Sequence, residues 1–121
     1  MSMLSGTHSR AVTRTAGAAI IKGQPLKAGA NPGEVVPCAT ATDVAIGVAG
    51  DDAEKGAVVP LCLLGGAGQT VLVLSGGAIA VGDAVGVTGA AVTTGLHIGR
   101  ALEAAVSGEL FECDPATCQT V

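Results

Sequence analysis

Two short stretches of this sequence, Ile46-Gly47-Val48-Ala49 and Ile98-Gly99-Arg100-Ala101, share the pattern Ile-Gly-x-Ala. Each is followed at the same distance by a glycine, Gly56 or Gly108, and then by a further apolar stretch. Self-similarity along a chain indicates an internal repeat. We therefore expect an internal duplication, in which two half-barrels of similar design share one core. A chance match in a chain rich in Gly, Ala and Val is the alternative.

Turn signals precede both copies of the pattern. Leu26-Lys-Ala-Gly29 comes before the first copy, and Ala80-Val-Gly-Asp83 comes before the second. A short valine-containing stretch follows each turn, Val35-Val36 in the first half and Val85-Gly-Val-Thr88 in the second. We therefore expect these two turns to be equivalent.

Nearly all the apolar stretches are short, rich in β-branched residues and bounded by Gly, Pro, Asn or Asp. This pattern is typical of strands separated by turns. Gly47 and Gly99 fall inside it and are expected to mark bends where a strand curls around a small barrel. The sequence therefore predicts an all-β fold, a small β-barrel or a β-clip or sandwich of short strands. The expected strands are 17–21, 34–38, 44–48, 57–64, 70–74, 84–87, 91–93 and 110–113.

Two features limit this prediction. The segment 99–106 contains good helix formers, but it is too short to be stable alone. It is either a strand with a bulge or one helical turn, so the fold contains at most one short helix. Because proline cannot donate to a strand ladder, we expect Pro37 and Pro60 at strand ends or in edge strands.

The composition excludes several classes of protein. Of 121 residues, 49% are hydrophobic and 13% are charged, and Phe111 is the only aromatic residue. This length predicts one domain, and the apolar content is too high for a disordered chain. With 6 basic against 10 acidic residues, the chain lacks the basic patch and the aromatic platforms that nucleic-acid binding requires. No apolar run is long enough to span a bilayer, and no secretory signal is recognisable. We therefore expect no nucleic acid and no membrane as partners, and folding in a cytoplasm.

Few residues are suited to catalysis. His8 and His97 are the only side chains that ordinarily titrate near neutrality, and both are expected to be structural or surface residues. The acidic run 51–54 is expected to be a solvated loop. The glycine-rich stretch 64–70 lacks the lysine and the following helix of a phosphate-binding loop, so a turn is expected there. We therefore expect no enzyme, no catalytic residue, no cofactor and no metal.

The four cysteines are Cys38, Cys62, Cys113 and Cys118. They are too sparse for a disulfide scaffold, and the gap between Cys113 and Cys118 is wide for a zinc site. Free thiols are expected, with a local disulfide or a metal as the alternative.

The N-terminal stretch differs from the rest of the chain because it is polar and carries Arg10 and Arg14. We expect residues 1–16 to form a flexible arm and residues 17–121 to form a single β-rich domain. Such an arm can become ordered by adding a strand to the sheet edge of a partner, and a disordered tail is the alternative. The small side chains of the domain bury little apolar area each, so oligomerisation is also expected.

The order of these features along residues 17–115 resembles that of the small head-decoration, or capsid cement, proteins of tailed bacteriophages. The matching features, in chain order, are Gly23, Pro25, Leu26 and Gly29; Val35-Val36-Pro37; Thr40-x-Thr42-Asp43; Ile46-Gly47-Val48-Ala49; the run from Gly76 to Asp83; and Ile98-Gly99-x-Ala101-Leu102-Glu103 with Gly108 behind it.

The resemblance implies a barrel-like fold without catalysis and binding to the outside of an expanded icosahedral shell. It implies the major capsid protein as partner and a homo-oligomer, with a trimer favoured. The virion would carry the protein on its capsid surface after assembly in the host cytoplasm. Related cement proteins commonly touch the lattice with an N-terminal arm, which implies Arg10, Thr13 and Arg14 as contact residues.

Two other functions remain open at this point. One is a small β-clip module that binds a ligand or carbohydrate, although glycan-binding faces usually need exposed aromatic residues. The other is an enzyme that uses Cys113 or Cys118 as nucleophile together with His97, which would require a reactive thiol of low pKa.

Overall fold

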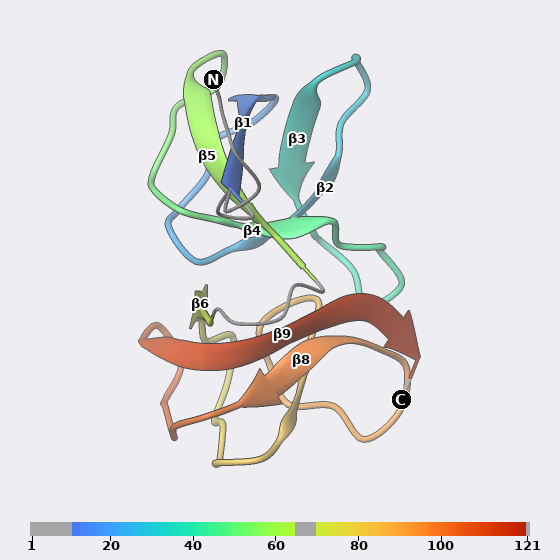
Figure 1. The fold of residues 1–121 in the computed structure, drawn as a ribbon, viewed down its shortest axis with the longest axis vertical. Coiled ribbons are helices and arrows are strands. Elements are labelled where there is room, and N and C mark those ends of the chain that lie inside the picture. The colour runs from blue at the N-terminus through green and yellow to red at the C-terminus, as the bar shows by residue number, and fades with distance from the viewer. Residues whose placement is uncertain (1–10, 65–69, 121) are drawn as a thin grey trace, which may run out of the picture.

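The computed structural model describes residues 11–64 and 70–120, and every regular element in them is a β-strand (Figure 1). The first five strands are β1 (Ala11–Ala16), β2 (Pro25–Ala28), β3 (Glu34–Pro37), β4 (Gly47–Ala49) and β5 (Val58–Leu63), and they form a closed barrel in the order β1-β3-β2-β4-β5. The other four are β6 (Val71–Leu74), β7 (Ala84–Gly86), β8 (Leu96–Ala101) and β9 (Leu110–Thr120), in a sheet of order β6-β9-β8-β7. The predicted all-β fold with a small barrel is confirmed.

The two halves of the chain repeat the same strand pairing. Strands β4 and β5 are antiparallel in the first half, as are β8 and β9 in the second. An offset of 52 residues converts every partner pair of β4 and β5 into a pair of β8 and β9. The matching pairs are Gly47↔Leu63 with Gly99↔Pro115, Val48↔Cys62 with Arg100↔Asp114, and Ala49↔Leu61 with Ala101↔Cys113. The expected duplication is therefore present, and the two Ile-Gly-x-Ala stretches enter equivalent strands.

Strands β6 and β7 are the counterparts of β1 and β2. Residues of β1 and β2 correspond to residues 59 positions later, while their partners on β5 and β4 keep the offset of 52. The corresponding pairs are Val12↔Leu61 with Val71↔Cys113, and Leu26↔Gly47 with Val85↔Gly99. Each half is thus built on four strands in one register, β1-β5-β4-β2 or β6-β9-β8-β7.

The turn that leads into β2 is the counterpart of the turn that leads into β7. The amide of Ile21 donates to Oε1 of Gln24 at 2.8 Å, and the amide of Ala80 donates to Oδ2 of Asp83 at 2.9 Å. Residues 21–24 therefore match Ala80–Asp83, and the predicted equivalence of Leu26–Gly29 with that turn is wrong. The physical reason is the polar fourth residue, which closes each turn by accepting the amide of the first.

The two halves differ in the connection that follows. Strand β3 pairs antiparallel with β2 and parallel with β1, and so it closes the barrel. The second half is seven residues shorter here, since the offset falls from 59 to 52 between the β2 and β4 equivalents. In place of a strand it has a tight turn in which the Gly86 amide donates to the Ala90 carbonyl at 2.7 Å.

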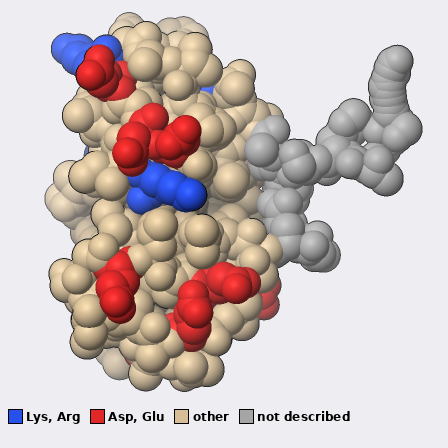
Figure 2. All heavy atoms as spheres, turned by 90° about the vertical axis from the view of Figure 1, so that its left-hand side faces the viewer, with Lys and Arg blue, Asp and Glu red and all other residues tan. Residues whose placement is uncertain are grey.

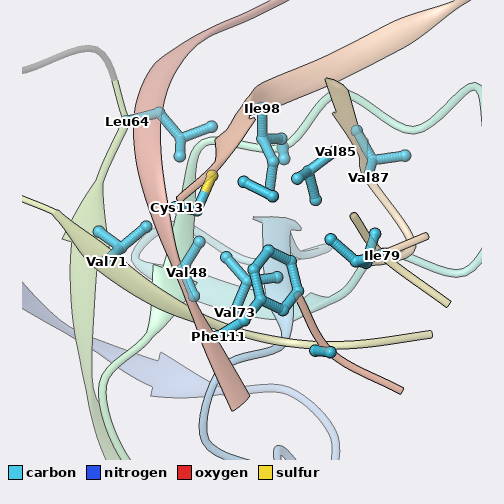
Figure 3. Close-up of a cluster of buried hydrophobic side chains, with 13 residues drawn as sticks. Val48, Leu64, Val71, Val73, Ile79, Val85, Val87, Ile98, Phe111 and Cys113 are labelled. Carbon is cyan, nitrogen blue, oxygen red and sulfur yellow. The ribbon is translucent and has the colours of Figure 1, made fainter. Parts of the chain in front are cut away.

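Two apolar clusters stabilise this arrangement. The smaller one fills the barrel and includes Leu26, Val35, Val59 and Leu61. The larger one fills the second half around Phe111 and takes in Ala45, Val48 and Leu64 from the first half. Figure 3 shows the Phe111 ring beside Val48, Val73 and Ile79. The larger cluster is thus shared between the halves, as expected, but the prediction of two half-barrels with one core is wrong, because the first half closes a complete barrel around a cluster of its own.

Several predicted strands are displaced. Strands β1 and β2 lie where an arm and a turn were expected, whereas 17–21 and 91–93 contribute only single bridges, at Ile20 and Ala91. In the ambiguous segment 99–106, residues 99–101 belong to β8, which shifts register between His97 and Gly99, and residues 102–106 contribute a single bridge at Ala105 instead of a helical turn.

The two prolines have different outcomes. Pro37 ends β3, as predicted, but Pro60 lies inside β5, which is paired on both sides. A residue's N and carbonyl point to the same neighbour in an antiparallel strand. The Pro60 carbonyl accepts from Gly50, just past the end of β4, so the missing donor costs no ladder bond.

The predicted arm also changes its boundary. Residues 11–16 form β1, whose partners run from Ala11↔Cys62 to Thr15↔Val58 on β5. The sequence suggested an arm because the stretch is polar, but its backbone satisfies the edge of β5. Residues 1–10, which include His8, lie outside the described residues.

Candidate interaction surface

The three residues implied as capsid contacts fall on or next to β1. Thr13 and Arg14 are exposed residues of that strand, while Arg10 lies outside the described residues. Their surface is therefore part of the barrel wall, and the barrel determines its geometry.

The backbone of β1 is only partly covered. Its Thr15 amide donates to the Gly33 carbonyl at 2.9 Å, next to the first residue of β3. Backbone groups alternate in direction along a strand, so those of Thr13 point to the same side, beyond the start of β3. Among the described residues the Thr13 amide has no acceptor. We call this stretch, with the side chains of Thr13, Arg14 and Thr15, the β1 edge.

Arg14 restricts access to the β1 edge. It pairs across the sheet with Val59, so its side chain starts from the face that Val12 and Ala16 turn to the barrel core. It is nevertheless exposed, and its Nη1 donates to the Thr13 carbonyl at 2.8 Å. A charged residue that begins on the inner face of an edge is one device that limits unspecific strand pairing. The β1 edge therefore offers one free backbone donor and one cation.

A second polar feature lies in the connection between β3 and β4. Asp43 accepts the amides of Ala39 and Thr40 at 2.8 and 3.0 Å and forms an ion pair with Lys27 at 3.0 Å. These two amides, and then Lys27, lower the pKa of Asp43 to about 2. This arrangement is structural, because it uses the carboxylate to hold the connection against β2.

Cys113 was considered above as a nucleophile, and its surroundings do not favour that role. Its side chain is fully buried, and this burial, with Asp114 as a further cause, raises the pKa of the thiol to about 12. Burial and then Asp43 raise the pKa of Cys38 to about 11. A nucleophile needs the opposite shift. His97 is buried as well, and all four cysteines are free.

The acidic run between β4 and β5 borders an open groove. Asp52 accepts the Lys22 amide at 2.7 Å, and Asp51 accepts the Asp52 amide at 2.8 Å. The groove has a volume of about 530 Å³ and is lined by Ile20, Ile21, Asp52, Ala53, Glu54, Ala57 and Val58. The exposed carboxylates here act as turn acceptors rather than as a pair converging on one point.

Three further observations concern ligands. Within residues 11–64 and 70–120, no group of three or more His, Cys, Asp or Glu side chains is placed to hold a metal ion. No helix in this part of the chain is long and apolar enough to cross a membrane. The expected turn at 64–70 lies mostly outside the described residues.

No protein-family model and no curated protein matches the chain. Among solved structures, it is similar to the crystal structure of the N base of head fiber gp8.5 in bacteriophage phi29. The TM-score is 0.68 with 23% sequence identity, over 90% of this chain and 95% of that chain. The fold is that of a phage head-fiber base. The match spans both halves, so it includes the duplication, and it confirms the resemblance to phage head proteins at the level of the fold.

The sequence predicted contact residues in this region but assigned them to a flexible arm. The resemblance to cement proteins implied Thr13 and Arg14 as contacts, and the structure places both as exposed residues of β1. What polarity could not show is that β1 belongs to a barrel, because that depends on its pairing with β5 far along the chain.

Proposed function

We propose that this protein is a structural component of a phage head, a decoration or cement protein that binds the outer surface of the mature head and stabilises its shell. The observation that carries the proposal is the fold match to a head-fiber base over 90% of the chain. The order of sequence motifs supports the same group of proteins independently of the coordinates.

The β1 edge supplies a first means of attachment. Its Thr13 amide can donate one backbone hydrogen bond to a carbonyl of an extended segment of the major capsid protein, in the manner of strand addition. Arg14 and Arg10 can pair with carboxylates of the shell. Each such contact is weak on its own, since exposed ion pairs contribute at most about 1 kcal/mol.

Stabilisation of the shell would then result from many weak contacts acting together. A homo-oligomer, with a trimer favoured, would present several edges at once, and linked contacts gain avidity without new interactions. A protein that binds only the mature lattice raises the free energy needed to break that lattice. We place the protein on the virion surface after assembly in the host cytoplasm.

The rival carbohydrate-binding function receives no support from the structure. Phe111 is the only aromatic residue of the sequence, and it is completely buried in the shared core. A sugar ring therefore finds no aromatic surface to stack on.

The test uses heads prepared from phage that lack this protein. Added protein is expected to co-sediment with mature heads to saturation, to leave immature shells unbound, and to raise the temperature at which heads release their DNA. Absence of saturable binding to mature heads would refute the proposed function. Arg14→Ala should weaken binding severalfold without changing the melting temperature of the free protein.

A further inference from the structure

The outer face of the second sheet carries leucines. On β6 and β9, Val71, Val73 and Phe111 point to the core, so the alternate residues point outward. Leu72 and Leu110 are each 40% exposed, and Leu74 pairs directly with Leu110. Leu102 is 48% exposed and lies against the same strand, because its amide donates to the Glu112 carbonyl at 2.9 Å. We call Leu72, Leu74, Leu102 and Leu110 the leucine face.

The repeat shows that the strand register does not require leucine at these positions, although Leu74 and Leu110 also approach Gly23 of the first half. The equivalent positions of the first half, at the offsets given above, hold Thr13, Thr15, Gly50 and Val58. The strands there have the same register and close a complete barrel with two threonines, a glycine and one exposed valine, Val58, at these positions. Exposed aliphatic side chains that the register does not need are typical of an interaction surface.

Acidic residues border the leucine face and also interrupt it, because Glu112 lies between Leu72, its partner on β6, and Leu102. The Glu112 amide donates to Oε1 of Glu103 at 2.8 Å, and Oε2 of Glu112 accepts the Thr70 hydroxyl at 3.1 Å. Glu109 precedes Leu110 and is exposed. On the side nearer β7, Arg100 stands opposite Asp114 in the strand register and donates to the Gly82 carbonyl at 3.2 Å.

Acidic side chains therefore outnumber the basic ones around the leucine face, where Lys22 of the first half lines a cavity together with Leu72. Arg100 is the single basic residue between 70 and 120, against Asp83, Glu103, Glu109, Glu112 and Asp114. Figure 2 shows acidic but no basic side chains on the lower half of the face turned to the viewer, the end at which Figure 1 places β6, β8 and β9.

We propose that the leucine face and its acidic residues, which we call the acidic rim, form a docking surface for a protein partner that presents apolar side chains interspersed with lysine and arginine. Burial of the leucines would supply affinity, and the complementary rims would supply register and a faster encounter. Resting on the proposed function, the partner is the shell of the head, which this face meets in addition to the β1 edge.

A second copy of this chain fits the surface poorly. The net charge of the sequence is −4, and its residues 11–64 carry four basic against five acidic side chains. Another copy would therefore bring no basic ring to the glutamates, and like charges facing each other across an interface are unfavourable. Charge thus selects a different protein with a basic surface.

The test compares matched variants in binding to heads that lack the protein. Leu72→Thr combined with Leu102→Ser alters the leucine face, and the threonine reproduces the residue found at the equivalent strand position of the first half. Val44→Ser is the control, because Val44 is 59% exposed and lies in the first half, outside both surfaces. We expect the double variant to bind about tenfold more weakly, as for loss of one to two anchoring side chains, and the control to bind normally.

A charge variant provides a second readout that leaves the apolar packing intact. Glu103→Gln, Glu109→Gln and Glu112→Gln together keep the hydrogen-bond acceptors of the rim. Binding by this variant should be weaker at low salt, and raising sodium chloride from about 0.05 to 0.5 M should affect it less than the wild type, since screening acts only on charge.

The outcomes separate the two proposals. The proposed docking surface is refuted, and the proposed function stands, if the wild type binds heads and both sets of variants bind as tightly as the wild type at every salt concentration. If the wild type does not bind heads, the proposed function fails and this assignment with it. Circular dichroism and thermal melting show whether each variant is folded, and binding is compared only at temperatures where all are.

Discussion

The two halves of this protein place the same four strands in the same register and yet end as different structures. In the first half the connection after β2 is long enough to hold β3, which pairs with β1 and closes a barrel. In the second half the connection is seven residues shorter, and the sheet β6-β9-β8-β7 stays open. The comparison teaches that closure here depends on one inserted strand, while the register depends on the repeated core.

The halves also divide the apolar residues unequally. The barrel cluster involves only first-half residues, whereas the larger cluster is centred on Phe111 and recruits residues such as Val48 from the first half. The first half therefore buries some of its apolar side chains against residues of the second half. The exposed residues of the two halves also differ. In the first half β1 has a polar edge, whereas β6 and β9 of the second half carry exposed leucines.

The largest effect is expected from truncating the centre of the shared core. Phe111→Ala should lower the free energy of unfolding by about 3–5 kcal/mol, because the phenyl ring is completely buried and leaves a cavity. Val59 occupies the equivalent position in the barrel, and Val59→Ala should cost only about 2 kcal/mol. Urea denaturation of both variants measures the difference. Equal losses would show that the two cores contribute alike.

A pair of equivalent glycines tests the contact between the halves. Gly23 and Gly82 have φ angles of 90° and 87°, so alanine at either position costs about 1–2 kcal/mol in backbone strain. At Gly23 a Cβ would also lie 2.5 Å from Leu110 Cδ2 and 2.6 Å from the Leu74 amide nitrogen, whereas at Gly82 it would meet nothing. Gly23→Ala should therefore cost about 1–3 kcal/mol more than Gly82→Ala.

Thermal unfolding followed by circular dichroism is the measurement for this glycine pair. A Gly23→Ala variant as stable as Gly82→Ala would mean that the first half can move away from β6 and β9 at no cost, contrary to a shared rigid core.

The smallest expected effect concerns the long connection of the first half. The pKa of Asp43 is lowered to about 2, mainly by the amides of Ala39 and Thr40 and then by Lys27. A carboxyl group with a lowered pKa stabilises the folded state above its ordinary pKa, and that contribution is lost as the pH falls through about 2. Asp43→Asn should thus be less stable than the wild type at pH 6.

The pH dependence provides the control for Asp43. The difference between wild type and Asp43→Asn should shrink as the pH falls from about 4 toward 2, measured by urea denaturation at each pH. A difference that does not change with pH would assign the effect to lost hydrogen bonds of the loop rather than to the charge of Asp43.

The sequence was a good guide where local pattern and structure coincide. Ile-Gly-x-Ala and the glycines behind it predicted the repeat, because a duplicated strand pair keeps the bends and the small residues that its register requires. Strand β1 was missed because Arg14 occupies an inward position, which breaks the apolar alternation that marks a strand. Strand β2 was missed because Pro25-Leu-Lys-Ala28 looks locally like a turn and is extended only by pairing with β3 and β4.

The candidate surfaces show the same limit. The polarity of Thr13 and Arg14 was visible in the sequence, but their place on a partly covered barrel edge depends on where β3 begins. The leucine face was visible only as the alternation from Val71 to Leu74, which does not say which side is buried. Phe111 and Cys113 on β9 decide that, and they lie about forty residues further along the chain.

The most direct test of the account is an image of the mature head by electron cryomicroscopy, with and without this protein. The account predicts density for this β-domain on the outer surface of the shell, with β1 and the leucine face turned toward the lattice. Density inside the shell, or heads that look the same whether or not the protein is present, would contradict it.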